Sequence, residues 1–213
     1  MIFSKRVLDN GLRIITIPDQ NSLAATVLVL VEAGSKYETK EINGLSHFLE
    51  HMCFKGTQKR PRAIDITSEL DSLGAQYNAF TGQEYTGYYA KVTSDHFDQA
   101  LDLVSDLYLN PIFRNEEIEK EKGVIVEEIN MYEDIPQRKV GDLLMELLYG
   151  NQPAGWPIAG EKEIVKSLSK EGLVGYRNKH YVSSATTVVV AGKFDEATVF
   201  EKIEKSFSGV SSG

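Results

Sequence analysis

Cysteine and long hydrophobic runs are scarce in this sequence, and each shortage excludes a class of protein. Cys53 is the one cysteine among 213 residues, so an internal disulfide framework is excluded. The longest strongly apolar run, at residues 24–31, is far too short to cross a bilayer. The start, residues 1–6, lacks the apolar stretch of a secretory signal and the Arg and Ser richness of a transit peptide. We therefore expect a soluble, intracellular-type protein located in the cytoplasm.

Basic residues are also in short supply. The chain has 23 Lys and Arg against 31 Asp and Glu, a formal net charge of −8. This balance argues against a nucleic-acid binder and mildly favours basic or neutral peptides as ligands of an acidic cleft. The composition, 42% hydrophobic and 25% charged, is that of a globular chain long enough for one substantial core or two small ones.

Two histidines lie one helical turn apart at residues 47–51, with a glutamate beside them. On a helix, His47 and His51 are about 40° apart around the axis, so both rings can reach one ion. Glu50 lies about 60° to the other side. Asn43 is predicted to cap the start of this helix, and residues 55–57 to end it. The opposite side carries apolar residues that can anchor the helix in a core: Leu45, Phe48, Leu49 and Met52.

A helix that presents two neutral imidazoles suits zinc, which favours nitrogen and sulfur ligands and keeps one position open for water in catalytic sites. Two ligands are not enough, so the chain must supply a third ligand and a base. Glu50 is in the wrong rotational position to be an easy ligand, yet it is close enough to take a proton from water at the metal. Taken alone, the motif could also be a chance pair of histidines on a surface helix.

Residues 115–132 are predicted to form a long helix that supplies the third ligand. Asn115 is predicted to cap its start. With Glu121 at zero degrees, Glu128 falls near about −20° on the same apolar face, whereas Glu127 projects about 120° away and should be solvated. A buried carboxylate is costly unless it is paired or binds a metal. Glu128 is therefore the better ligand, although both inward acids could instead belong to a salt-bridge network.

The chain resembles the inverzincin metalloproteases of the pitrilysin family, in particular the processing-peptidase β-subunit branch and its bacterial relatives. Four segments carry the resemblance: GLSHFLEHM at 44–52, FKGT at 54–57, NAFT at 78–81 and EKGVIVEE at 121–128. The resemblance implies that His47 and His51 bind zinc and that Glu50 activates the water. It also implies that Glu128 completes the ligand set and that Glu121 supports a ligand from behind.

The segment at residues 75–81 is predicted to be a strand that binds substrate. An extended peptide can add to a free sheet edge through backbone hydrogen bonds, while side-chain pockets choose residues. By the same resemblance, Asn78 and Ala79 match edge positions that hold the substrate backbone, and Phe80 matches a residue near the pocket after the scissile bond. The alternative is a plain internal hairpin with no role in binding.

The order of strands and helices predicts an α+β fold, with a mainly antiparallel sheet packed against a layer of helices. Strands are expected at residues 12–17, 24–32, 75–81, 85–92 and 186–191, and helices at residues 62–73, 94–109, 115–132, 137–148 and 196–207. Residues 1–207 are expected to form one zinc-binding domain of catalytic type. Residues 208–213, rich in Ser and Gly, are expected to be a tail or the start of an interdomain linker.

Members of the resembled family usually carry two similar halves, and this chain corresponds to the first. The expected function is therefore that of a zinc endopeptidase domain that hydrolyses extended peptides. It would need a homologous C-terminal half, a separate partner subunit or a second copy of the chain for full activity. A noncatalytic assembly or scaffold subunit is the alternative. A lyase with the same motif would need a distal cysteine ligand, and Cys53 is expected in the core instead.

Overall fold

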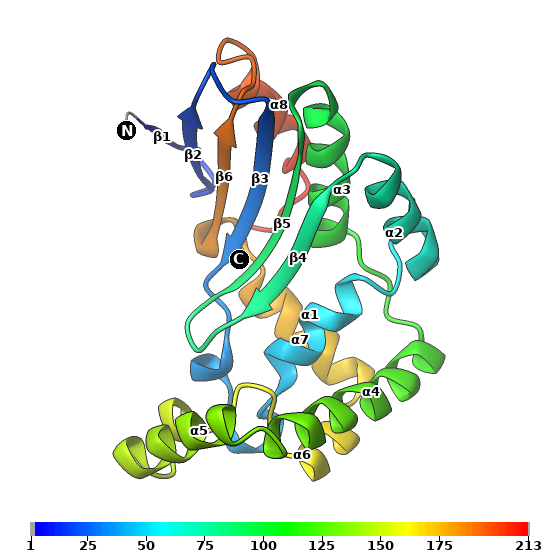
Figure 1. The fold of residues 1–213 in the computed structure, drawn as a ribbon, viewed down its shortest axis with the longest axis vertical. Helices are drawn as coiled ribbons and strands as arrows, with labels where there is room; N and C mark the ends of the chain where they lie inside the picture. Colours follow the sequence, from blue (N-terminus) through cyan, green and yellow to red (C-terminus); the bar gives the residue numbers. More distant parts are fainter. Residues whose placement is uncertain (1–2, 213) are drawn as a thin grey trace.

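The computed structural model describes residues 3–212, and Met1, Ile2 and Gly213, the last residue of the predicted tail, lie outside the described residues. Within the described part, the chain forms one six-stranded sheet, helices that cover one of its faces and a further group of helices beyond its lower end (Figure 1). The predicted α+β class is confirmed. No helix of residues 3–212 is long and apolar enough to cross a membrane.

The sheet has the strand order β1-β2-β6-β3-β5-β4. Its strands are β1 (Ser4–Val7), β2 (Arg13–Pro18), β3 (Ala24–Val31), β4 (Gln76–Thr81), β5 (Thr86–Thr93) and β6 (Thr186–Gly192). Strands β2 and β6 run parallel, and the other neighbouring pairs of this sheet run antiparallel. The prediction of a mainly antiparallel sheet is therefore confirmed, and β4 lies at one edge of the sheet.

Alternation along β3 explains which face of the sheet is covered. Ala25, Val27, Val29 and Val31 are buried, whereas the residues between them are half-buried. Successive side chains of a strand point to opposite faces, so one face of β3 carries the core. Helix α3 (Phe97–Leu109) packs on β3 and β5, and α8 (Val199–Ser206) packs beside α3.

The other helices are α1 (Leu45–Cys53), α2 (Ala63–Ser72), α4 (Asn115–Glu133), α5 (Pro136–Tyr149), α6 (Lys162–Ser167) and α7 (Lys170–His180). Short 3-10 helices form at η1 (Ser35–Tyr37), η2 (Lys40–Ile42), η3 (Ser94–His96), η4 (Pro153–Gly155) and η5 (Ser183–Ala185). Sequence periodicity did not predict β1, α6 or α7. The residues of β1 are all exposed and show no apolar alternation, and α7 contains two glycines, Gly172 and Gly175.

Both asparagine caps predicted from the sequence are wrong. Asn115 is the first residue of α4 itself, and no side chain caps that helix. Gly44 occupies the cap position of α1 with φ of 95°. The Asn43 side chain donates instead to Glu38 and to the carbonyl oxygen of Pro157, both at 3.1 Å. A tertiary contact has therefore replaced the local one at the start of α1.

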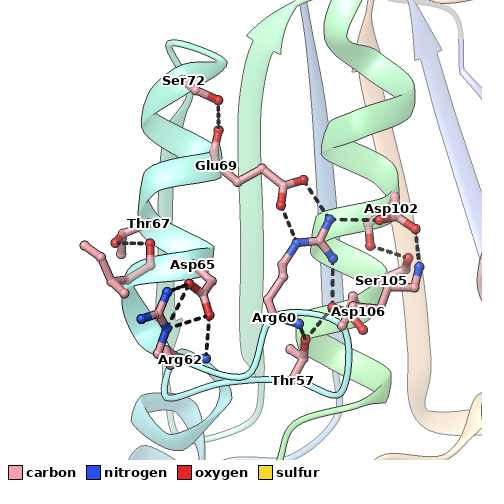
Figure 2. Close-up of polar contacts among 12 residues, drawn as sticks. Thr57, Arg60, Arg62, Asp65, Thr67, Glu69, Ser72, Asp102, Ser105 and Asp106 are labelled. Atoms are coloured by element: carbon pink, nitrogen blue, oxygen red, sulfur yellow. Dashed lines mark hydrogen bonds and ion pairs between the residues drawn. The ribbon is translucent and has the colours of Figure 1, made fainter.

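A buried arginine joins α2 to α3 (Figure 2). Arg60, 8% exposed, lies in the connection between α1 and α2. Its guanidinium donates to Glu69 at 2.6 and 2.7 Å, to Asp102 at 2.9 Å and to Asp106 at 2.8 Å. We call this group the Arg60 cluster, which consists of Thr57, Lys59, Arg60, Glu69, Asp102, Asp106 and Asn110. It fixes the chain that leaves the C-terminal end of α1.

Candidate metal centre

Helix α1 is held by its apolar side and turns its polar side towards α4. Leu45, Phe48, Leu49 and Met52 are at most 1% exposed, as the helical pattern predicted. The helix packs against β4, α4 and α7. Since side chains three and four residues apart share one face of a helix, this anchoring places His47 and His51 together on the side of α4.

The start of α1 is capped by a residue from the preceding 3-10 turns. Glu38 is 4% exposed, and its carboxylate accepts hydrogen bonds from the backbone N–H groups of Gly44 at 2.8 Å and Ser46 at 2.6 Å. Burial raises the pKa of Glu38, and the hydrogen bonds from Ser46, Gly44 and Asn43 offset part of that rise. A carboxylate at a helix N-terminus satisfies backbone donors that the helix itself cannot pair. Glu38 therefore fixes where α1 begins.

Two glycines let another segment approach this start closely. A Cβ atom on Gly44 would lie 2.6 Å from the carbonyl oxygen of Ala159. A Cβ atom on Gly160, which has φ of 81°, would lie 2.4 Å from the carbonyl oxygen of Asn43. Both positions also have a positive φ that L side chains rarely adopt. The loop at residues 157–160 thus clamps the N-terminus of the helix that carries the histidines.

Three predicted ligands from α1 and α4 converge on one point. Nε2 of His51 lies 3.3 Å from Nε2 of His47 and 3.4 Å from Oε2 of Glu128. Nε2 of His47 lies 3.7 Å from the same oxygen. A tetrahedral zinc ion with bonds of about 2.0 to 2.1 Å holds its ligand atoms about 3.3 to 3.4 Å apart. The three side chains therefore fit a zinc ion with little rearrangement.

The chemistry of these three atoms also calls for a cation. Neutral imidazole nitrogens that accept, and carboxylate oxygens, carry lone pairs that repel one another unless a proton or a metal ion lies between them. A positive ion at the meeting point of the three ligand atoms would remove this repulsion.

The pKa values of the three groups indicate the same need. Burial, followed by the charge of His51, lowers the pKa of His47 to about 4. Burial would also lower the pKa of His51, but the hydrogen bonds and charges of Glu121 and Glu128 outweigh it and raise that pKa to about 9. The hydrogen bond from His51 lowers the pKa of Glu128 to about 2. Without a metal, a proton on His51 supplies the positive charge.

Glu121 holds one of the ligands from behind. Its Oε1 lies 2.8 Å from Nδ1 of His51, and its Oε2 lies 2.6 Å from Nζ of Lys55. Burial raises the pKa of Glu121, but the hydrogen bonds and charges of His51 and Lys55 outweigh this rise. The pKa therefore lies below its usual value, and the carboxylate is ionised. When Nδ1 of His51 donates to this carboxylate, its Nε2 is left free as a metal ligand.

Glu128 is oriented by a residue one turn later on the same helix. The Tyr132 hydroxyl donates to Oε1 of Glu128, which leaves Oε2 to face the two imidazoles. The guanidinium of Arg138, on α5, lies 4.3 Å from the centre of the Tyr132 ring. Glu127, by contrast, is exposed, as predicted. The sequence pattern thus distinguished correctly between the two neighbouring acids.

The predicted base, Glu50, contacts the edge strand β4. It is half-buried, and the Thr81 hydroxyl donates to its Oε2 at 2.5 Å. Burial raises the pKa of Glu50, and the hydrogen bond from Thr81 offsets part of the rise. Cys53 is buried and its thiol contacts the Tyr88 hydroxyl at 3.5 Å, so it lies in the core as predicted.

The predicted substrate residues lie on the edge strand β4. Ala79 is 9% exposed and points to the same face as Thr81, whereas Phe80 is 37% exposed and points with Asn78 to the other face. The backbone N–H of Ala79 donates to Oδ1 of Asn78 at 2.9 Å. Phe80 and Tyr85 form an edge-to-face pair with ring centres 6.1 Å apart.

Sequence reasoning missed four side chains that shape this centre: Glu38, Lys55, Thr81 and Tyr132. Two of them carried a usable signal, because Lys55 lies four residues after His51 and Tyr132 lies four residues after Glu128. Glu38 and Thr81 reach α1 from elements that are separate in sequence, and spacing alone does not reveal such contacts.

A cavity of about 790 Å³ lies beside the centre, between the end of α4, α5 and the loop at residues 150–160. Tyr132, Ile129, Leu143 and Trp156 are among its lining residues. Since Tyr132 also contacts Glu128, the cavity adjoins the candidate ligands.

Comparison with protein families and with named proteins gives consistent matches. Residues 13–162 match the family model described as Insulinase (Peptidase family M16). Over 198 residues the chain is 41% identical to a Bacillus subtilis (strain 168) protein named "Uncharacterized zinc protease YmxG", covering 93% of this chain and 48% of that protein. It is 36% identical over 206 residues to the Caenorhabditis elegans mitochondrial-processing peptidase subunit beta, covering 97% and 44%. The chain therefore spans about half the length of these relatives.

Two solved structures share the fold. A protease from Helicobacter pylori superposes with a TM-score of 0.92 at 23% identity, covering 99% of this chain and 51% of that chain. The "peptidase M16 inactive domain" from Pseudomonas fluorescens superposes with a TM-score of 0.91 at 15% identity, covering 100% of this chain and 52% of that chain. At these identities the likeness concerns the fold.

Proposed function

Because the chain belongs to the insulinase family of peptidases, peptidase family M16, we propose that it is the zinc-binding part of an endopeptidase that hydrolyses extended peptides. The observation that carries this proposal is the convergence of Nε2 of His47, Nε2 of His51 and Oε2 of Glu128 at 3.3 to 3.7 Å. Glu50 lies on the same helix as the two histidines. Two imidazoles and one carboxylate with an open fourth position are a ligand set of catalytic zinc.

Each side chain has a defined task in this proposal. Bound zinc would supply a Lewis acid at the peptide carbonyl and would make water a better nucleophile. Glu50 takes the proton of the attacking water and then gives it to the leaving amine. Its burial, which raises its pKa, suits a group that must both accept and release a proton near neutral pH. Glu121, paired with Lys55, keeps Nε2 of His51 directed at the metal.

We propose that the peptide binds as an added strand on the free edge of β4. The backbone N–H of Ala79 is satisfied by the side chain of Asn78, so a substrate carbonyl could replace that intrastrand contact. Phe80, exposed beside Tyr85, offers an apolar surface for a substrate side chain near the scissile bond. The adjoining cavity between α4 and α5 provides further room for the peptide.

We further propose that a homologous second half, a separate partner subunit or a second copy of the chain completes the enzyme. Residues 1–207 would form the catalytic-type domain, and residues 208–213 would begin the connection to the other half. The half-length coverage of the relatives supports this arrangement. Exposed apolar residues on α5, including Leu144 at 53% and Leu147 at 82%, provide surface that such a partner could cover.

The second candidate is a noncatalytic assembly subunit of a peptidase-like complex. The Pseudomonas fluorescens structure with the same fold is named as an inactive domain, so a noncatalytic role is the second candidate for this chain. Against it, this chain brings the two histidines and the distal glutamate together in one group, and it retains Glu50 beside His51 in the sequence. The two candidates differ in whether any form of the protein hydrolyses peptides.

The test is metal analysis together with a peptide-cleavage assay, on this chain alone and with a candidate second half. The wild type should hold about one zinc per chain and cleave peptides. Glu50→Gln should keep the zinc and lose about 10² to 10⁴-fold in kcat, because the general base is gone. Glu116→Gln, an exposed acid at the start of α4, is the matched control and should behave like the wild type. Wild-type activity in Glu50→Gln would overturn the proposal, and zinc binding without hydrolysis in every pairing would favour the noncatalytic subunit.

A further inference from the structure

Thr81 is the last residue of the edge strand β4, and its hydroxyl donates to Oε2 of Glu50 at 2.5 Å. We infer that Thr81 is a positioning residue that holds the base Glu50 in place and couples it to the peptide-binding strand. This inference rests on the proposed function and deepens it, because it identifies what orients the base before substrate arrives.

The Thr81 hydroxyl is itself fixed by the sheet. Thr81 pairs in register with Thr86 on β5, and their hydroxyl oxygens lie 3.4 Å apart. Thr86 is fully buried and donates to the carbonyl oxygen of Ala33 at 2.8 Å. A hydroxyl has a single proton to donate, so Thr86 has no proton left for Thr81, and Thr81, which donates to Glu50, has none left for Thr86. The two hydroxyl oxygens therefore lie in contact, and the backbone pairing of β4 with β5 and the few rotamers of a β-branched side chain hold Thr81 in place.

Glu50 depends on this contact for its orientation. Among residues 3–212, the hydrogen bond that holds the Glu50 carboxylate comes from the Thr81 hydroxyl. Glutamate has several rotatable side-chain bonds, so its carboxylate needs a partner to stay in one position. The ligands are held by different contacts: His51 contacts His47 and Glu121. Loss of the Thr81 hydroxyl therefore frees the carboxylate to rotate away without disturbing any metal ligand.

The same strand would bind the substrate and hold the base, which itself lies on α1. Ala79, whose backbone N–H lies at the proposed peptide-binding edge, is two residues before Thr81 and points to the same face. Phe80, between them, points to the opposite face. A peptide that pairs with the edge of β4 would therefore meet a base that the end of the same strand already holds in place.

The test compares Thr81→Val with Thr81→Ser in the zinc-loaded protein, using a fluorogenic peptide. Valine keeps the shape but lacks the hydroxyl, and serine keeps the hydroxyl. Thr81→Val is expected to lower kcat about 10 to 100-fold, because a misplaced base costs rate. Its KM, zinc affinity and unfolding midpoint should stay near wild-type values. Thr81→Ser should recover most of the lost kcat. Thr93→Val, at the exposed end of β5, is the matched control and should leave kcat unchanged.

Wild-type kcat in Thr81→Val, or equal losses in the Val and Ser variants, would overturn the inference. Crystal structures of the wild type and Thr81→Val supply a readout that does not depend on activity. The Glu50 carboxylate should leave its wild-type position in Thr81→Val, while His47, His51 and Glu128 stay in place. An unmoved Glu50 would overturn the inference even if the wild type proved inactive, whereas inactivity by itself would count against the proposed function alone.

Discussion

The Arg60 cluster and the metal centre are both groups of acidic and basic side chains, yet their polar atoms are paired to different degrees. In the Arg60 cluster, both oxygens of Glu69, Asp102 and Asp106 accept hydrogen bonds. Figure 2 shows those that Arg60 donates. In the metal centre, Glu121 is equally well paired, but Oε2 of Glu128 faces two imidazole nitrogens.

This difference separates a group that holds the fold from a group that is prepared for an ion. A buried charge is tolerable when its partners are complete, and an incomplete set is costly. Proteins keep such incomplete sets mainly where function needs them. The guanidinium of Arg60 lies at the centre of the first cluster. In the second, the three ligand atoms are 3.3 to 3.7 Å apart, as they would be around a zinc ion.

The largest effect is expected from removing the cation of the complete cluster. Arg60→Met should lower the free energy of unfolding of the metal-free protein by about 3 to 5 kcal/mol, because it leaves carboxylates unpaired around a side chain that is 10% exposed. Urea denaturation measures the loss. Arg62→Met removes a neighbouring arginine whose side chain is 71% exposed, and it should cost far less. Equal losses in the two variants, or a changed zinc affinity in Arg60→Met, would break the comparison.

The corresponding change in the metal centre should lower zinc affinity more than stability. Glu128→Gln removes a ligand charge, so zinc affinity should fall by more than the roughly 10 to 100-fold typical of an outer partner. Stability of the metal-free protein should fall less than in Arg60→Met. Competition with a chelator measures the affinity. Glu127→Gln, on the exposed side of the same helix, serves as the control. Wild-type zinc affinity in Glu128→Gln would remove that residue from the ligand set.

A smaller effect is expected when the support behind a ligand is changed. Glu121→Gln still offers an oxygen to His51 but loses its charge, so it should weaken zinc affinity or activity by about 10 to 100-fold. The same chelator competition and peptide assay report it, with the exposed Glu119→Gln as control. If both quantities stay at wild-type values, Glu121 has no supporting role behind His51.

The smallest effect, counted per unit of change, concerns pH. The pKa of His51 in the metal-free protein is raised from 6.5 to about 9, so His51 is protonated below about pH 9 and zinc must displace that proton. Zinc affinity should therefore rise about tenfold per pH unit up to about pH 9 and then level off. Chelator competition at several pH values measures the slope. An affinity that is flat above neutral pH would mean that His51 has an ordinary pKa and that Glu121 and Glu128 do not act on it.

Much of the metal centre could be predicted from helical spacing. Residues four apart on α1 and the inward stripe of α4 selected His47, His51 and Glu128, and the structure brings these three together. This succeeded because each relation lies within one helix, where 3.6 residues per turn fix the geometry. That the two helices supply one site was implied by the family resemblance and not by spacing.

The rest could not be predicted, because tertiary contacts decide it. Asn43 is a sound local cap, but Glu38 takes that role through a turn several residues earlier. Thr81 meets Glu50 across 31 positions of sequence, between a strand and a helix. Helix α7 was missed because Gly172 and Gly175 weaken its local helical preference, which packing overrides. Spacing identifies residues that share an element, and it does not identify their neighbours from other elements.

The central claim is that His47, His51 and Glu128 hold one zinc ion beside Glu50. It is tested most directly by a crystal structure of the zinc-loaded protein with anomalous data at the zinc absorption edge. We expect a single strong peak at about 2.0 to 2.2 Å from both Nε2 atoms and from Oε2 of Glu128, with the Glu50 carboxylate next to the open position. Zinc bound at any other group of residues, with these three side chains left uncoordinated, would contradict it.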